Sequence, residues 1–189
     1  MAASAIYTTL AALLTYPEAD YSQRIGRSLD SAPLDCCDQV KLFANAVHGI
    51  PTDELQELFT RTFDLNPVCS LELGWHLFGE NYERGVLLVR MREELRRHRL
   101  RESSELPDHL TQVLRLVGEM EHEYAADFVA ACVLPALEKM LHAVHGRGNP
   151  FEHLLLAVNS LLRSDFPEIP LSAPETEPLL KVLDEGCRQ

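Results

Sequence analysis

The sequence has too little positive charge for a protein that binds polyanions. Its 189 residues include 17 Lys and Arg against 29 Asp and Glu, so the formal net charge is −12. Nucleic acids and anionic membrane surfaces attract proteins through clustered positive charge. The charge balance therefore argues against nucleic acid or an anionic membrane as the main partner.

Long apolar runs are also absent. No window approaches the roughly 20 apolar residues that a membrane-spanning helix requires, which argues against integral membrane association. The stretch from Ala5 to Leu14 is apolar enough for a signal peptide, but no Lys or Arg precedes Arg24. A secretory signal needs a positively charged segment before its apolar core. We therefore expect a cytoplasmic protein.

Cysteines are few and form no recognisable site. The five are Cys36, Cys37, Cys69, Cys132 and Cys187. An odd number without C-x-x-C spacing predicts neither a disulfide framework nor a zinc site. This usage is typical of a reducing compartment. We expect Cys132, on the apolar face of a helix, to pack as a small hydrophobic residue.

Strand-like alternation is lacking, whereas helical periodicity runs through almost the whole chain. A chain of this length buries roughly 70% of its unfolded surface, which suffices for one core. We predict an all-α, single-domain bundle of about eight or nine helices over residues 1–163. A Pro-rich acidic tail follows over residues 164–189, with a short helix expected near residues 179–183.

Two long helices dominate this prediction, over residues 81–100 and 121–145. In the first, the apolar run from Val86 to Val89 covers every side of the helix and predicts a central position. In the second, Pro135 removes one backbone donor, so we expect a kink or a break there. Pro107 predicts the start of another helix, which runs to about Val117.

Candidate catalytic groups are sparse. Asp108 and His109 have the chemistry of an orienting carboxylate and a general base, but adjacent residues on a helix point in different directions. We instead expect Asp108 to interact with the dipole of the helix that Pro107 starts. His142 and His145 are three residues apart, yet no further ligand follows at the usual spacing for zinc. A small hydrolase built on these histidines is the least favoured alternative.

Charge is unevenly distributed along the chain. Between Arg84 and Arg101 there are seven arginines and two glutamates, which leaves +5; since the total is −12, the remaining residues carry −17. We expect most of these arginines to lie on a solvated face, paired with acidic neighbours such as Glu102 and Glu105. Arg84 adjoins the apolar half of its helix, where an unpaired guanidinium is costly, so we expect a buried or half-buried carboxylate partner.

Trp75, His76 and Phe78 form an aromatic cluster between two glycines. Core packing is the default interpretation of such a stripe. Tryptophan is also enriched among the residues that anchor protein interfaces. The cluster therefore allows a second interpretation, a groove that accepts an apolar segment.

Three motifs occur in order: Thr62-Phe63-Asp64-Leu65-Asn66-Pro67, then Gly74-Trp75-His76-Leu77-Phe78-Gly79-Glu80 with Arg84-Gly85, then Glu105-Leu106-Pro107-Asp108-His109-Leu110. Together with Leu13-Leu14-Thr15-Tyr16-Pro17 they resemble the nitrate reductase assembly chaperone (NarJ) family, within the TorD/DmsD group of redox-enzyme maturation proteins. The resemblance covers about residues 6–165. It implies an all-helical cytoplasmic chaperone without catalysis.

Such chaperones bind the N-terminal leader of a molybdoenzyme catalytic subunit until its cofactor is inserted, and they delay twin-arginine export where the client is exported. The resemblance implies a peptide-binding surface at Trp75, His76, Phe78, Glu80, Leu106, Pro107, Asp108 and His109. It assigns Arg84 and Gly85 a structural role or a transient contact with molybdopterin guanine dinucleotide carried by the client. No tightly bound cofactor and no metal are implied.

The composition supplies a physical mechanism for leader binding. An apolar groove would take the apolar face of a helical leader, and carboxylates on its rim would orient the basic end. The clients of this family include respiratory nitrate reductase and enzymes acting on ethylbenzene, dimethyl sulfide, selenate or chlorate, and the sequence does not choose among them. The alternative from another class is a helical scaffold bound constitutively in a redox complex. The sequence leaves the oligomeric state open.

Overall fold

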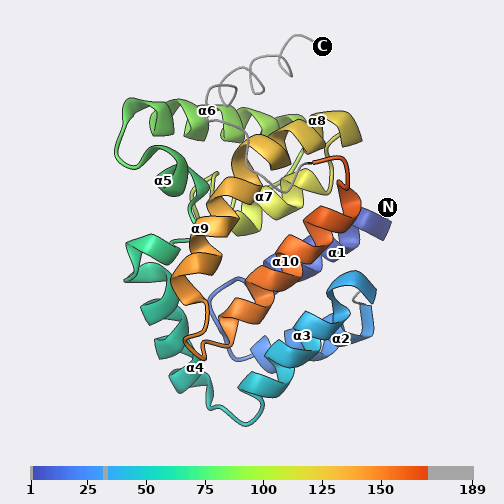
Figure 1. The fold of residues 1–189 in the computed structure, drawn as a ribbon, viewed down its shortest axis with the longest axis vertical. Coiled ribbons are helices and arrows are strands. Elements are labelled where there is room, and N and C mark those ends of the chain that lie inside the picture. The colour runs from blue at the N-terminus through green and yellow to red at the C-terminus, as the bar shows by residue number, and fades with distance from the viewer. Residues whose placement is uncertain (1, 32–33, 170–189) are drawn as a thin grey trace.

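The computed structural model describes residues 2–31 and 34–169, and in these ranges the chain is a bundle of α-helices without a strand (Figure 1). The elements in order are α1 (Ala2–Leu13), α2 (Tyr21–Ser31), α3 (Leu34–Val47), α4 (Thr52–Phe59), the π-helical turn η1 (Thr60–Asp64), the 3-10 turn η2 (Pro67–Cys69), α5 (Leu73–Phe78), α6 (Tyr82–Arg97), α7 (Leu110–Val117), α8 (His122–Phe128), the π-helical turn η3 (Val129–Val133), α9 (Leu134–Val144) and α10 (Phe151–Asp165). Counting α8, η3 and α9 as one bent helix gives nine helices in the described residues. The predicted all-α class is confirmed.

The core lies between two pairs of helices, α10 against α3 and α1 against α7 (Figure 1). Phe151 begins α10 and has no exposed surface. Its ring centroid lies 5.6 Å from that of Phe43, 5.5 Å from that of Phe59 and 5.2 Å from that of Phe63. Aromatic rings at these separations add to the stability that burial of their surface provides. This cluster ties α3, α4 and η1 to α10.

The expected interruption near Pro135 is present. The helix that begins at His122 widens into the π-helical turn η3 over Val129–Val133, directly before Leu134 and Pro135. Proline lacks the amide hydrogen of a regular turn, and its ring crowds the carbonyl of the residue four positions earlier. A π-helical turn relieves this crowding without ending the helix. The helix therefore continues into α9, which forms one wall of the site described below.

Helix α6 is less central than the sequence predicts. It runs along one edge of the bundle (Figure 1). Of the run from Val86 to Val89 only Leu87 is fully buried, and Val89 is 54% exposed. An edge helix has neighbours on one side only, so an apolar run around its whole circumference cannot be covered. The prediction of a central helix is wrong for this reason.

The chain beyond α10 remains packed on the core up to Ile169. Phe166 and Ile169 are both buried, and Phe166 stacks on His122. The boundary predicted at residue 163 stays a prediction. Pro170, Pro174, Pro178 and the helix expected near residues 179–183 lie outside the described residues. Within the described ranges, no helix combines the length and apolar character needed to cross a bilayer.

Candidate functional site

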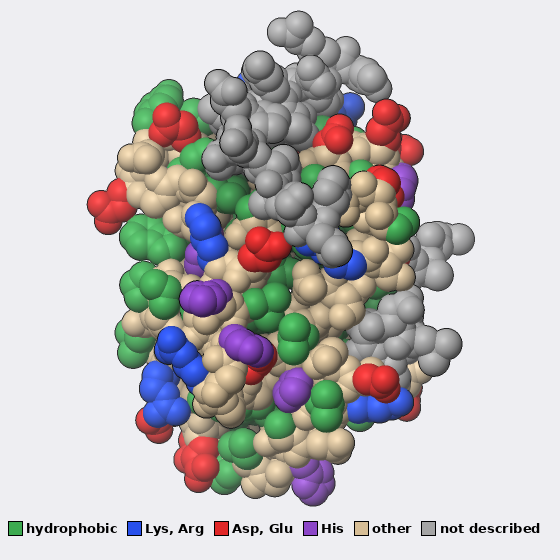
Figure 2. Space-filling view, in the orientation of Figure 1, with side chains coloured by type: hydrophobic (Ala, Val, Ile, Leu, Met, Phe, Trp, Pro, Cys, Tyr) green, Lys and Arg blue, Asp and Glu red, His purple; other side chains and the backbone are tan. Residues whose placement is uncertain are grey.

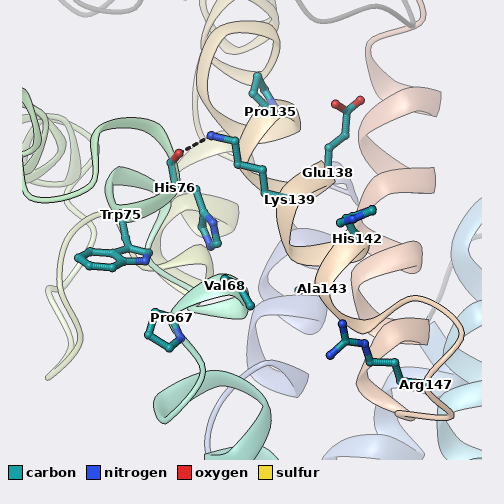
Figure 3. Close-up of a pocket in the computed structure, with 10 residues that line it drawn as sticks. All are labelled: Pro67, Val68, Trp75, His76, Pro135, Glu138, Lys139, His142, Ala143 and Arg147. Carbon is teal, nitrogen blue, oxygen red and sulfur yellow. Dashed lines mark hydrogen bonds between the residues drawn. The ribbon is translucent and has the colours of Figure 1, made fainter.

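A cleft opens between α5 and η2 on one side and α9 on the other (Figure 3). It encloses a cavity of about 710 Å³ whose floor is apolar. The residues that line it are Pro67, Val68, Trp75, His76, Pro135, Glu138, Lys139, His142, Ala143 and Arg147. Val68 is 62% exposed, so its apolar side chain is accessible to a ligand in the cleft. The cleft is therefore the main candidate binding site of the described chain.

The wall formed by η2 and α5 is held against α9 by polar contacts. Cys69 is fully buried, and its Sγ donates to the carbonyl of Met140 on α9 at 3.7 Å. The Nζ of Lys139 donates to the carbonyl of His76 at 2.5 Å (Figure 3). The His76 ring contacts the Ser70 carbonyl through Nε2 at 2.7 Å. Trp75 and His76 are thus held at the mouth of the cleft.

Asp108 connects α5 to the start of α7. Its side chain has no exposed surface, and its Oδ2 accepts a hydrogen bond from the amide of Gly74 at 2.8 Å. Leu73 donates its amide to the Asp108 carbonyl at 3.0 Å, and Leu110 donates to the Leu71 carbonyl at 2.7 Å. Burial raises the pKa of the Asp108 carboxyl, while the Gly74 amide and Arg84 oppose this rise. The carboxylate satisfies one of the amides that the first turn of α5 leaves without an internal partner.

The position of Asp108 corrects the sequence interpretation. Helix α7 begins at Leu110, so Pro107 and Asp108 precede it, and His109 is its N-cap. The carboxylate therefore meets the N-terminal end of α5, a helix far away in the sequence, and not the helix of its own motif. A carboxylate is favourable at either place for the same reason, since the N-terminal end of a helix carries partial positive charge.

Arg84 has the carboxylate partner that the sequence predicts. Its guanidinium lies 2.5 Å from Oε2 of Glu72, and the two side chains are 19% and 32% exposed. The same guanidinium lies 5.6 Å from the centroid of the Trp75 ring, within range of a cation–π contact. Arg92 and Arg96 pair with Glu102, as expected for a solvated helix face, whereas Glu105, the other acid expected to pair, forms no ion pair in the described residues. The arginines of α6 are thus largely neutralised by nearby acids.

A second, acidic cavity adjoins the cleft on the other side of Trp75. It has a volume of about 390 Å³ and shares Pro67 and Trp75 with the cleft. Its remaining lining residues are Phe63, Asp64, Ser70, Leu71, Glu72, Arg84, Glu105 and His109. Three carboxylates here face a single guanidinium, which Glu72 already neutralises.

A third cavity, of about 400 Å³, adjoins the opposite end of the cleft and shares Ala143 and Arg147 with it. It is lined by Leu58, Arg61, Thr62, Asn66, Val144, Gly148 and Asn149 besides the two shared residues. Among these described residues the charged side chains are Arg61 and Arg147, so this cavity is basic. Asn149 donates to the Thr62 hydroxyl at 2.8 Å and so holds the loop after α9 against η1.

The predicted peptide-binding residues are distributed unevenly around these cavities. Trp75 and His76 line the cleft, and His109 lines the acidic cavity. Glu80 is exposed and Leu106 is 39% exposed, whereas Phe78 packs partly against the core. Pro107 and Asp108 are buried, so their side chains support the cleft wall from behind. Their contact with a peptide stays a prediction.

The sequence interpretation missed the α9 side of the cleft. Lys139, His142 and Arg147 face the cavity from there, with Glu138 as the one acid among the cavity's lining residues. Three further carboxylates, those of Asp64, Glu72 and Glu105, lie beyond Trp75 in the acidic cavity, and the role of rim carboxylates in leader binding stays a prediction. On the α9 side the only candidate site residues in the sequence are His142 and His145, a pair without a further zinc ligand, and the sequence does not predict Lys139 or Arg147 as site residues.

The structure separates the residues of the hydrolase alternative. Asp108 binds Gly74, whereas Nδ1 of His109 contacts the Thr111 hydroxyl at 2.7 Å and accepts from the Thr111 amide at 3.4 Å. His145 contacts Glu152 at 2.8 Å. In the described ranges no three His, Cys, Asp or Glu side chains are grouped so that they could hold a metal ion.

Cys132 packs as the sequence predicts. Its side chain is 1% exposed, and burial raises the pKa of its thiol to about 12. The thiolate is therefore not available as a nucleophile near neutral pH.

Comparison with known proteins identifies relatives. A family profile described as the nitrate reductase delta subunit matches residues 30–150. Two proteins named nitrate reductase molybdenum cofactor assembly chaperone NarJ, from Escherichia coli K12 and from Escherichia coli O157:H7, are each 26% identical to the chain over 163 residues. These alignments cover 81% of this chain and 69% of each relative. All three motifs quoted above lie inside the matched range.

We predict opposite effects of the same substitution at two glycines. A Cβ at Gly74 would lie 2.7 Å from Oδ2 of Asp108, so Gly74→Ala should lower the free energy of unfolding by about 1–3 kcal/mol. A Cβ at Gly85, inside α6, meets nothing within 4 Å, so Gly85→Ala should raise it by about 0.5–1 kcal/mol. Urea unfolding of both variants measures the difference. Equal effects would show that the contact of Gly74 with Asp108 is not tight in solution.

We also predict a pH dependence that arises at His109. Burial lowers the pKa of its imidazole from 6.5 to about 4, so the folded state binds fewer protons than the unfolded state between these values. The free energy of unfolding should therefore fall as the pH is lowered through this window. The contribution is at most about 3–4 kcal/mol, because one pKa unit corresponds to about 1.4 kcal/mol.

The matched variant is His109→Asn, which retains an N-cap acceptor but does not titrate. Urea unfolding at pH values across the window should give a shallower decline for the variant than for the wild type. His76, whose pKa burial also lowers, is present in both proteins and cancels in the comparison. Identical slopes would mean that His109 does not carry this dependence.

Proposed function

The chain belongs to the nitrate reductase delta subunit family, and from this premise we propose that it is a non-catalytic assembly chaperone for a molybdoenzyme catalytic subunit. The relatives are named for the assembly of a cofactor-containing enzyme and not for a reaction of their own. The separation of Asp108 from His109 agrees with this proposal, since it leaves the proposed base without an orienting carboxylate.

The observation that carries the proposal is the apolar cleft between α5 and α9. We propose that it binds the N-terminal leader of the catalytic subunit as an amphipathic helix. Helices bind to grooves through apolar side chains at intervals of three and four residues. The ring of Trp75 and the exposed side chain of Val68 offer the apolar contact that such a helix needs.

The acidic cavity beyond Trp75 supports the second half of the proposal. Leaders of this class combine basic residues with an apolar stretch, and Asp64, Glu72 and Glu105 lie where basic residues next to a bound apolar face would reach. Charge complementarity of this kind sets orientation and association rate more than it sets affinity. The affinity should therefore decrease with salt without vanishing, because the apolar contact persists.

In this role the chain would hold the leader in the cytoplasm until the molybdenum cofactor is inserted, and delay twin-arginine export where the client is exported. Respiratory nitrate reductase is the client that the relatives' names favour. The alternative clients that we propose are the enzymes that act on ethylbenzene, dimethyl sulfide, selenate or chlorate.

Transient contact of the client's molybdopterin guanine dinucleotide with Arg84 and Gly85 stays a prediction. A phosphate at Arg84 would have to displace Glu72, which lies 2.5 Å from the guanidinium. Gly85 faces open space and presents no side-chain donor. These residues therefore fit a structural role better than a cofactor site.

We predict that a client leader peptide quenches or shifts the fluorescence of the protein, because Trp75 is the single tryptophan of the chain and lines the cleft. Val68→Asp should weaken the binding by at least about tenfold, since it places a charge against the apolar face of the peptide. The matched control is Leu42→Asp, an exposed leucine on α3 that is 46% exposed and lines none of the three cavities. Calorimetry at low and high salt gives both affinities. Absence of binding at any salt concentration contradicts the proposal.

A second prediction separates the chaperone from a constitutive scaffold. The chain, tagged and recovered from native cytoplasm, should retain the catalytic subunit in its cofactor-free form. The mature enzyme, purified by its own tag, should contain none of the chain. Mass spectrometry and molybdenum analysis of both samples provide the measurement. A fixed ratio of the chain in the mature enzyme would instead identify a structural subunit.

A further inference from the structure

The three cavities adjoin one another, and we treat them together as one groove with the cleft in the middle. The acidic cavity and the cleft share Pro67 and Trp75, and the cleft and the third cavity share Ala143 and Arg147. In Figure 3, Trp75 and Arg147 lie on opposite sides of the cleft. An elongated ligand that fills the cleft therefore meets the acidic cavity at one end and the third cavity at the other.

The acidic end of this groove carries excess negative charge. Glu72 is neutralised by Arg84. Asp64 and Glu105 form no ion pair within the described part of the chain, and both are exposed. Two carboxylates are thus free to interact with a positive group of a ligand.

The opposite end carries excess positive charge. Arg147 is exposed and its guanidinium has no hydrogen-bond or ion-pair partner among the described residues. Arg61 has only a marginal contact with Glu57, at 4.0 Å, and the two side chains are 69% and 78% exposed. In Figure 2 basic side chains lie directly below the hydrophobic strip that covers η1 and η2 at the left edge. This end is suited to a negative group.

The charge distribution along a bound helix can be complementary to the charge distribution along this groove. Its N-terminal end carries partial positive charge and unpaired amide donors, and its C-terminal end carries partial negative charge and unpaired carbonyl acceptors. A helix with its N-terminus at Asp64 and Glu105 and its C-terminus at Arg61 and Arg147 is favoured at both ends. The reverse orientation is unfavourable at both ends.

We infer that the groove binds the client leader in one orientation only, with the N-terminal end of its helix in the acidic cavity and the C-terminal end at Arg61 and Arg147. The inference rests on the proposed function and adds to it a requirement on the client. An acidic residue or the free helix end should follow the apolar stretch of the leader, close to the loop formed by Gly146, Arg147 and Gly148.

The orientation can be measured by photo-crosslinking. Two synthetic peptides with the client's N-terminal sequence carry a benzophenone amino acid, one at the first and one at the last position of the helix. With the full-length protein, the first should crosslink near Glu105 and His109, and the second in the loop at residues 145–149. Mass spectrometry of proteolytic fragments distinguishes these regions because they are far apart in the sequence. Reversed or mixed crosslinks would overturn the inference and leave the proposed function standing.

Charge variants provide an independent readout. Glu105→Lys should lower the affinity for a peptide with basic N-terminal residues by about three- to tenfold. The affinity for a peptide with glutamines at these positions should stay nearly unchanged. Arg147→Glu should lower the affinity for a peptide that ends in Glu by a similar factor, and should change the affinity for a peptide that ends in Gln much less. Arg101→Glu is the matched control, since Arg101 is exposed and lines none of the three cavities.

The outcomes separate the two proposals. If the wild type binds the leader but each variant lowers the affinity for all peptides equally, the inference is wrong and the proposed function remains. If the wild type binds no leader peptide, both are wrong. Selective loss at the matching end of the peptide, together with the expected crosslinks, supports both.

Discussion

The hydrogen bond between the buried carboxylate of Asp108 and the amide of Gly74 connects the parts of this protein that matter for binding. Helix α5 has only six residues, and a helix of this length is not stable by itself in water. Its first turn is completed by a carboxylate that precedes α7, and backbone hydrogen bonds from Leu73 and Leu110 reinforce the contact. Trp75 and His76 reach the cleft because α5 is held in this way. Asp108, a fully buried residue of the third motif, thus positions side chains of the second motif.

Charge pairing has a second organising effect. The arginines of α6 are a prominent feature of the sequence, yet Arg84 pairs with Glu72, and Arg92 and Arg96 pair with Glu102. Near the cleft, Asp64, Glu105 and Arg147 form no ion pair among the described residues, and Arg61 has only its contact with Glu57 at 4.0 Å. The net charge of −12 is therefore a poor guide to binding, since the arrangement of a few unpaired groups along one groove determines what the protein can orient.

Local patterns predicted much of the fold, and they failed where burial depends on distant parts of the chain. Periodicity and proline positions indicated the helices and the interruption before Pro135, because both depend on neighbours within one or two turns. The run at Val86–Val89 misled because its burial depends on whether other helices surround α6, which no local pattern states. The motifs predict Trp75, His76 and His109 as site residues, and these side chains line the cleft or the acidic cavity. Lys139 and Arg147 are not predicted, because α9 meets α5 only in the folded chain.

The all-α class, the need of Arg84 for a carboxylate partner and the family motifs can all be recognised in the sequence. That Asp108 completes a distant helix, and that acidic and basic cavities lie on opposite sides of one apolar cleft, becomes visible only in the folded chain. The two groups of features differ in the distance over which their interactions act. Helix formation and the cost of a buried charge are properties of a residue and its near neighbours. A groove exists only where helices far apart in the sequence pack against each other.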